Sequence, residues 1–198
     1  MGAMIVLALL ARHSLPVAGI AAWNMPFPSR LTARAAQAAL AWERFRLGSD
    51  VPSRLMPLFT FRTWVNAVPD ARTPFDWLSR DSKSIETFMD DPSCGFEPTG
   101  GLWEALFDFS LAITAPGAFV ALRKDLPIQL VGGAADPVTG NGRSVRRLES
   151  HLRGKGFLNL EPRIYEENRH ESLNELNRNL IMKDFAAWAE NASARRTG

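Results

Sequence analysis

The sequence predicts an α/β protein in which parallel strands alternate with helices and a helical segment is inserted between two of the strands. Short apolar runs of strand length occur at residues 17–25 and 127–136. An amphipathic stretch at 144–153 follows the second run, and then come a further strand-like stretch and a longer helical pattern. Strand, helix, strand and helix at these lengths are typical of a layered domain with a parallel sheet.

Length and composition agree with one domain, or one domain with an inserted segment, because the chain has 198 residues. Hydrophobic residues make up 46% and charged residues 22%, which supports a packed core and excludes extensive disorder. The net charge is only +2 and the charges are interspersed, so we expect no nucleic-acid surface. The single cysteine, Cys94, excludes an intramolecular disulfide.

The opening run, MGAMIVLALLAR, is rich in Ala, Leu and Met and apolar on nearly all sides, which predicts a buried helix through Arg12. It is as short as the apolar part of a signal peptide, but no Lys or Arg precedes it and no small-residue cleavage site follows. No run reaches the roughly 18 apolar residues of a spanning helix. We therefore expect a cytoplasmic protein without a stable membrane span.

The next elements are a strand within 17–25, ended by the sequence PFPS, and a helix over 32–47. The helical spacing places Ala36, Leu40 and Phe45 on one side of this helix, and Arg44 and Arg46 on the other.

Residues 48–116 change character, since they are rich in Pro, Trp and Phe. They predict short helical pieces. One of these begins at Asp81 or Ser82, which can cap it, and ends at Pro92. We expect the aromatic side chains of this segment to face inward or toward a ligand.

The last third of the chain carries the alternating strands and helices. The helix over 144–153 is expected to bury Val145, Leu148 and Leu152, and the stretch 160–170 predicts a strand and a loop. Ser172 and Glu175 have the spacing of a capping box and predict the start of the last helix. The inward positions of that helix would be Leu173, Leu176, Leu180, Phe185 and Trp188.

Two titratable residues follow predicted strands, Asp136 after the first and His170 after the next. The carboxyl ends of parallel strands share one edge, where ligands and catalytic groups gather. Each residue alone is more often structural, because Asp before Pro initiates turns and a His beside a helix start is common. Together they match the acid and base of a triad in the order Ser, Asp, His.

Other candidates for chemistry are weaker. His13 and His151 lie on helical stretches, where we expect surface or boundary positions, and Cys94 has no nearby base and is interpreted as a buried structural residue. His170 does not begin an H-E-x-x-H zinc motif, because Asn174 stands at the position of the second His. No nucleotide-binding motif is present. We expect no metal and no cofactor.

A nucleophile is the missing part, because the chain contains no Gly-x-Ser-x-Gly. In a nucleophile elbow, the Ser is followed by x-Gly and then by a buried helix rich in small residues. Met1, Gly2 and the apolar run after them fit that second half. On this interpretation the serine would come immediately before Met1.

Four motifs together resemble the α/β-hydrolase superfamily, in particular its monoacylglycerol lipase and lysophospholipase-like branch, also described as serine aminopeptidase-type hydrolases. They are Trp77-Leu78-Ser79-Arg80-Asp81, Asp91-Pro92-Ser93-Cys94-Gly95-Phe96, Asp136-Pro137-Val138, and Arg169-His170-Glu171 with Asn174-Glu175. Their order and spacing agree with the family pattern, and the resemblance extends over essentially the whole chain.

The resemblance implies the C-terminal part of an α/β-hydrolase fold: a helix and a core strand at 1–29, a helical cap at 30–116, and core strands and helices at 117–198. It implies that Asp136 is the triad acid, His170 the base and the Met1 backbone N–H an oxyanion-hole donor. The substrate would be a small-molecule ester or lipid, and no cofactor is implied. The first strands would be missing, which would leave an unpaired, apolar sheet edge.

Three functions therefore stay open. The first is an N-terminally truncated serine hydrolase of carboxylic esters, acylglycerol-like or lysophospholipid-like, that is inactive alone. The second is a non-catalytic remnant or module that binds a lipid or a partner. The third, a secreted or membrane-attached helical protein, depends only on the opening run. The sequence carries no signature of the oligomeric state.

Overall fold

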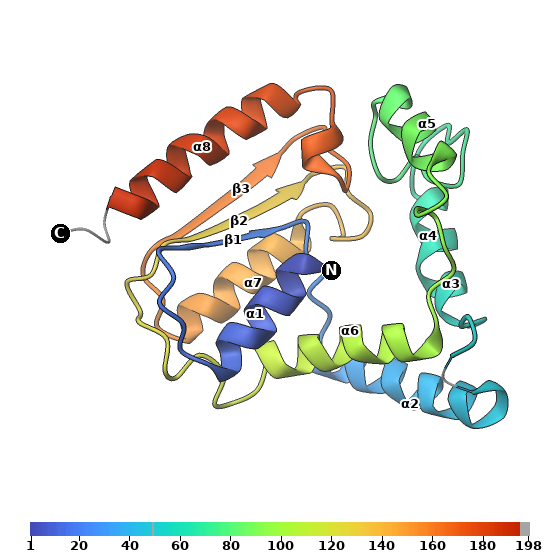
Figure 1. The fold of residues 1–198 in the computed structure, drawn as a ribbon, viewed down its shortest axis with the longest axis horizontal. Coiled ribbons are helices and arrows are strands. Elements are labelled where there is room, and N and C mark those ends of the chain that lie inside the picture. Colours follow the sequence, from blue (N-terminus) through green and yellow to red (C-terminus); the bar gives the residue numbers. More distant parts are fainter. Residues whose placement is uncertain (49, 195–198) are drawn as a thin grey trace.

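The computed structural model describes residues 1–48 and 50–194. In chain order the elements are α1 (Gly2–Arg12), β1 (Ile20–Trp23), α2 (Arg30–Leu47), α3 (Met56–Phe59), α4 (Phe61–Asn66), α5 (Ser82–Asp90), α6 (Gly100–Ile113), β2 (Ile128–Gly133), α7 (Arg143–Gly154), β3 (Leu160–Tyr165), the 3₁₀ turn η1 (Ser172–Asn174) and α8 (Arg178–Ala194). Figure 1 shows how these elements are arranged.

The sheet has three strands in the order β1-β2-β3, and both neighbouring pairs are parallel. Ile20 pairs with Ile128, and Ile128 pairs with Leu160, so the three strands begin at the same level. Their carboxyl ends therefore form one edge of the sheet. The predicted α/β architecture with parallel strands is confirmed, and β1 is shorter than the apolar run that predicted it.

Helices cover both faces of the sheet: α1 and α7 lie on one side and α8 on the other (Figure 1). The central strand β2 is buried along its whole length, and its one polar side chain, Gln129, accepts a hydrogen bond from the Trp23 ring N–H. The predicted inward residues of α7 are buried with it in one core, whose largest fully buried members include Leu7, Ile128, Leu130, Leu152 and Phe157. Each such side chain contributes roughly 1.5–3 kcal/mol by leaving water.

Helix α1 confirms the predicted opening helix, but it is not buried on all sides. Leu7 and Leu10 face the core, whereas Ile5, Val6 and Leu9 are 43–46% exposed. This difference arises because α1 packs against β1 and α6 and leaves its remaining face uncovered by the described residues. An apolar composition alone could not show which sides of the helix meet a neighbour.

The helical segment between β1 and β2 contains α2 to α6, and its two long helices, α2 and α6, pack along each other (Figure 1). Many of its aromatic rings point inward, as expected, in two small cores around Trp77 and Trp103. Asp81 caps α5, since its carboxylate accepts a hydrogen bond from the Lys83 N–H. Phe45 of α2 is 88% exposed, while Leu40 of the same helix is buried.

The prediction for the last helix is also partly wrong. Residues 172–174 form only a 3₁₀ turn, and α8 begins at Arg178. Glu175 does not close a capping box, because its carboxylate binds Arg80 instead. Burial in this region therefore differs from the prediction. Ile181 of α8 is buried, whereas four of the residues predicted to face inward are 37–63% exposed, namely Leu173, Leu176, Leu180 and Phe185.

Candidate active site

The two residues predicted from the strand ends meet at the carboxyl edge of the sheet. Asp136 lies in the turn after β2, and His170 lies in the loop after β3. His170 Nδ1 is 3.1 Å from Asp136 Oδ2. An ionised carboxylate can only accept hydrogen bonds, so in this pair Nδ1 carries the proton and the lone pair is left on Nε2. This is the tautomer that a general base in a triad requires.

Asp136 is completely buried, and hydrogen bonds fix both of its carboxylate oxygens. Oδ1 accepts from the Val138 N–H at 2.9 Å, and Oδ2 accepts from the Thr139 hydroxyl at 2.8 Å as well as from His170. The first donor belongs to the tight turn that Pro137 begins. These donors stabilise the buried negative charge and set the plane of the carboxylate toward the imidazole.

The approach of the His170 loop to β2 depends on a glycine. A side-chain Cβ at Gly133, the last residue of the strand, would lie 1.9 Å from the carbonyl oxygen of Asn168. No side chain can occupy that space, so this position allows the loop to pass directly over the strand end. The same carbonyl accepts a hydrogen bond from the Ala135 N–H at 3.0 Å, which joins the two loops behind Asp136 and His170.

The helical segment supplies a third side of the site. The ring of Trp77 lies 5.5 Å from the ring of His170, centroid to centroid, at an angle of 49°. The backbone of the two segments is also bonded, because the His170 N–H donates to the Trp77 carbonyl at 3.3 Å and the Glu171 N–H to the Leu78 carbonyl at 2.7 Å. Trp77 belongs to one of the four motifs, but its contact with His170 was not predicted.

Asn24 is a second residue of the site that was not predicted from the sequence. It follows β1, has a positive φ of 48°, and its side-chain amide donates to the His170 carbonyl and to Ser172 Oγ. The segment after each of the three strands therefore contributes a polar residue to this site. The signal in the sequence was the same one that identified Asp136, namely a polar residue directly after an apolar strand.

Met1 precedes α1, and its carbonyl accepts hydrogen bonds from the Met4 and Ile5 N–H groups. Burial lowers the pKa of its amino group. The amino end of α1 lies toward the same end of the sheet as the strand arrowheads (Figure 1). The assignment of the Met1 backbone N–H as an oxyanion-hole donor stays a prediction.

Among the described residues, no hydrogen bond joins the remaining candidates to this pair. His151 Nε2 is bonded to the Ile113 carbonyl at 3.1 Å, and burial lowers its pKa. His13 is exposed. Cys94 is partly rather than fully buried, which corrects the expectation of a buried cysteine. Within residues 1–48 and 50–194, no three His, Cys, Asp or Glu side chains are grouped closely enough to hold a metal ion.

Comparison with known proteins shows the family to which the chain belongs. The family model described as "Serine aminopeptidase, S33" matches residues 1–177. The chain belongs to this family of α/β-hydrolases. The matched range includes both Asp136 and His170. No match was found among curated protein sequences.

Solved structures share the fold. A lipase in its open form superposes with a TM-score of 0.80 at 20% identity, over 96% of this chain and 62% of the lipase. A thermostable carboxyl esterase from Bacillus coagulans gives 0.70 at 20%, over 98% and 61%, and a Paleococcus ferrophilus monoacylglycerol lipase gives 0.65 at 16%, over 96% and 65%. This S33 family chain thus spans less than two thirds of the length of these structures.

No helix among the described residues is both long and apolar enough to cross a membrane.

Proposed function

We propose that this S33 family chain provides the acid–base pair and the helical cap of a serine hydrolase that cleaves carboxylic esters, with acylglycerols or lysophospholipids as the substrate class. The observation that supports this most directly is the hydrogen bond between His170 Nδ1 and Asp136 Oδ2 at the carboxyl edge of the sheet. Family membership and the likeness to lipase and esterase folds agree with the same reaction.

The chemistry follows from the tautomer that Asp136 imposes. In the triad mechanism a serine Oγ attacks the ester carbonyl carbon while its proton passes to His170 Nε2. The protonated imidazole then gives this proton to the departing alkoxide, which leaves an acyl-enzyme. Water, deprotonated by the same nitrogen, releases the acid. Asp136 stabilises the positive charge that the imidazole carries between these transfers.

The nucleophile is not among the 198 residues, since no serine stands in a Gly-x-Ser-x-Gly sequence. We place it immediately before Met1, with the Met1 backbone N–H as an oxyanion donor, because Met1 and Gly2 open α1 as the residues after an elbow serine do. The units of this hydrolase would be 1–29, 30–116 as the cap, and 117–198. The chain alone is not expected to form an acyl-enzyme.

Reading the coding DNA upstream of the Met1 codon, in frame, is the first test. We expect an open frame that encodes Gly-x-Ser directly before Met1. The chain extended by that frame should hydrolyse p-nitrophenyl esters and monoacylglycerols. Asp136→Asn should lower kcat by a factor on the order of 10⁴, and His170→Ala by about 10⁶. His13→Ala, an exposed histidine at the end of α1, is the matched control and should leave kcat unchanged.

A stop codon or a frameshift directly before the Met1 codon would contradict the enzyme and favour a module that binds a lipid or a partner. The same conclusion would follow if the extended chain folded, carried the Gly-x-Ser and hydrolysed none of these esters.

A further inference from the structure

Glu175 is a fully buried carboxylate close to the candidate base, and the acid–base pair does not use it. Its oxygens accept four hydrogen bonds. Oε2 accepts from Arg80 Nε at 2.9 Å and from its neighbour's N–H, that of Leu176, at 3.2 Å. Oε1 accepts from the Arg169 N–H at 2.8 Å and from the Arg80 N–H at 3.3 Å. A buried charge is tolerated only with such complete pairing, so these partners hold Glu175 in one place.

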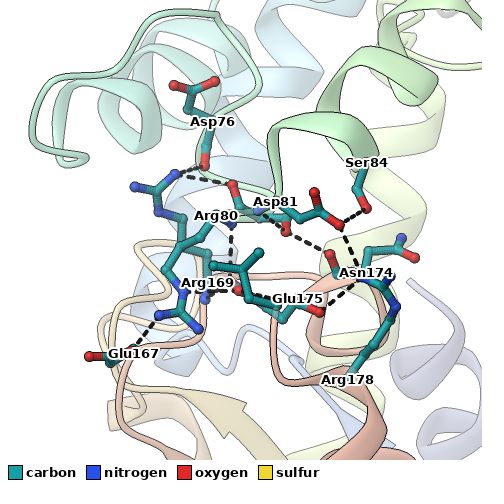
Figure 2. A network of polar contacts seen from close by, with 11 residues as sticks. Asp76, Arg80, Asp81, Ser84, Glu167, Arg169, Asn174, Glu175 and Arg178 are labelled. Carbon is teal, nitrogen blue, oxygen red and sulfur yellow. Dashed lines mark hydrogen bonds and ion pairs between the residues drawn. The ribbon is translucent and has the colours of Figure 1, made fainter.

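These bonds join two segments that are more than 90 residues apart in the sequence. Arg80 belongs to the helical segment, whereas Arg169 and Glu175 belong to the loop that carries His170 (Figure 2). The Arg169 guanidinium, from the loop, donates to two carbonyls of the helical segment, those of Asp76 and Ser79, at 2.7 and 3.1 Å. Ser79 Oγ donates a further hydrogen bond, at 2.8 Å, to the Asn174 carbonyl. We call these contacts between residues 76–80 and residues 169–175 the seam.

His170 lies inside this seam. The Arg169 N–H that precedes it is bound by Glu175, and its own N–H and that of Glu171 donate to the Trp77 and Leu78 carbonyls. The Trp77 ring is packed beside the imidazole. The helical segment thus binds the His170 and Glu171 N–H groups, Glu175 of the same loop binds the Arg169 N–H, and Asn24 binds the His170 carbonyl, while Asp136 binds only the ring. Loss of the seam would leave the His170 carbonyl bound to Asn24 but would release the N–H groups at 169–171, and so loosen the backbone from which the ring reaches Asp136.

We propose that Glu175 is a positioning residue: with Arg80 it locks segment 76–80 onto the loop 169–175, and this lock holds the His170 ring on Asp136. The inference rests on the proposed function, because it assigns His170 as the base. It implies that the orientation of the base depends on the docking of the cap, so that displacement of segment 76–80 would release His170 Nδ1 from Asp136.

Arg80 has a second carboxylate partner that offers a matched control. Glu167 Oε2 lies 2.5 Å from Arg80 Nη1, but the Glu167 side chain is 79% exposed. The Arg169 N–H donates to Glu175 and not to Glu167. A solvated pair of this kind contributes little. Glu175→Gln and Glu167→Gln each replace a carboxylate partner of Arg80 by an amide. Only the first leaves one acceptor oxygen where Arg80 Nε and the Arg169 N–H each need one.

The experiment follows His170 in the chain as it exists, in two ways. One is the low-field proton resonance of the imidazole Nδ1–H bonded to Asp136. The other is the rate at which diethyl pyrocarbonate modifies His170, measured against exposed His13 by mass spectrometry. In Glu175→Gln we expect the resonance to disappear and the relative rate to rise roughly fivefold to thirtyfold, the effect of losing one or two buried hydrogen bonds. Glu167→Gln should change neither.

A folded Glu175→Gln protein with unchanged resonance and rate overturns the inference and leaves the proposed function standing. If that variant does not fold, as its circular dichroism would show, Ser79→Ala decides. This variant removes the bond to the Asn174 carbonyl without burying a charge, and it should raise the rate in the same direction; no change overturns the inference. If the resonance is missing in the original chain, or survives in Asp136→Asn, the Asp136–His170 pair is absent and the proposed function itself fails.

Discussion

At the scale of single residues, the site is built around one carboxylate whose orientation is fixed before any substrate arrives. Asp136 accepts from a backbone N–H on one oxygen and from the Thr139 hydroxyl and His170 on the other. Thr139 is itself buried, so no water replaces its hydroxyl if it is lost. The hydroxyl therefore contributes both to the stability of the fold and to the direction in which Asp136 faces.

Replacement of this hydroxyl tests the argument. We expect Thr139→Val, which keeps the shape of the side chain, to lower the free energy of unfolding by about 1.5–3 kcal/mol, the range for a hydrogen bond to a charged group. Urea denaturation monitored by tryptophan fluorescence measures the change. Thr87→Val removes a hydroxyl bonded to a backbone carbonyl on the exposed side of α5 and should change stability by less than about 0.5 kcal/mol. Equal losses in the two variants would contradict a special role for Thr139.

The contact between Asp136 and His170 was predictable because a parallel sheet brings its carboxyl ends together whatever the rest of the chain does. Asp136 and His170 needed only that rule and the positions of two strands. Trp77 and Glu175 were not predictable in the same way. Their partners are His170 and Arg80, which lie more than 90 residues away and are reached only through the docking of the helical segment.

At the scale of elements, the same contrast separates α7 from α8. The pattern of α7 buries Val145, Leu148 and Leu152 as predicted, because one face of that helix packs against β2 and β3. The start of α8 was predicted from a capping box, but the Glu175 side chain binds Arg80 and the helix begins at Arg178. A local pattern that fits a cap was overruled by a tertiary ion pair.

The contact between β3 and α8 carries a prediction about titration. Tyr165 donates to Asp184 Oδ2 at 2.9 Å, and burial together with this hydrogen bond raises the pKa of Tyr165 to about 12. A tyrosine with a raised pKa keeps its proton longer in the folded chain than in the unfolded one. The stability that this contributes is fully present below pH 10 and is lost as the pH rises from there through about 12.

Because Tyr165 is the only tyrosine of the chain, the ultraviolet absorbance of tyrosinate reports on it alone. We expect a midpoint near 12 in the folded protein and near 10 in urea. Asp184→Asn should lower the folded midpoint, though not fully to 10, because burial remains. Asp125→Asn, which removes an exposed partner of Arg123, is the control and should leave the midpoint unchanged. A folded midpoint near 10 would show that α8 does not pack on β3 in this way.

At the scale of the whole molecule, the sheet has an open edge beside an apolar helix face. Strand β1 pairs with β2 on one side, and no other strand among residues 1–48 and 50–194 pairs with it. The neighbouring helix α1 exposes Ile5, Val6 and Leu9. Unpaired strand groups next to exposed apolar side chains form a template for association. The sequence predicted this edge from the resemblance alone, since composition does not show which side of a sheet is unpaired.

We therefore expect the isolated chain to self-associate in a concentration-dependent way, and light scattering after size exclusion measures this. The double variant Ile5→Glu with Leu9→Lys makes the α1 face polar and places an acidic and a basic residue four positions apart, so the helix itself is preserved. It should shift the mass toward that of one chain without loss of helical circular dichroism. Leu158→Lys changes an equally apolar residue, 73% exposed, that does not belong to α1. If it reduced association as much as the double variant, general surface hydrophobicity rather than the α1 face would hold the chains together.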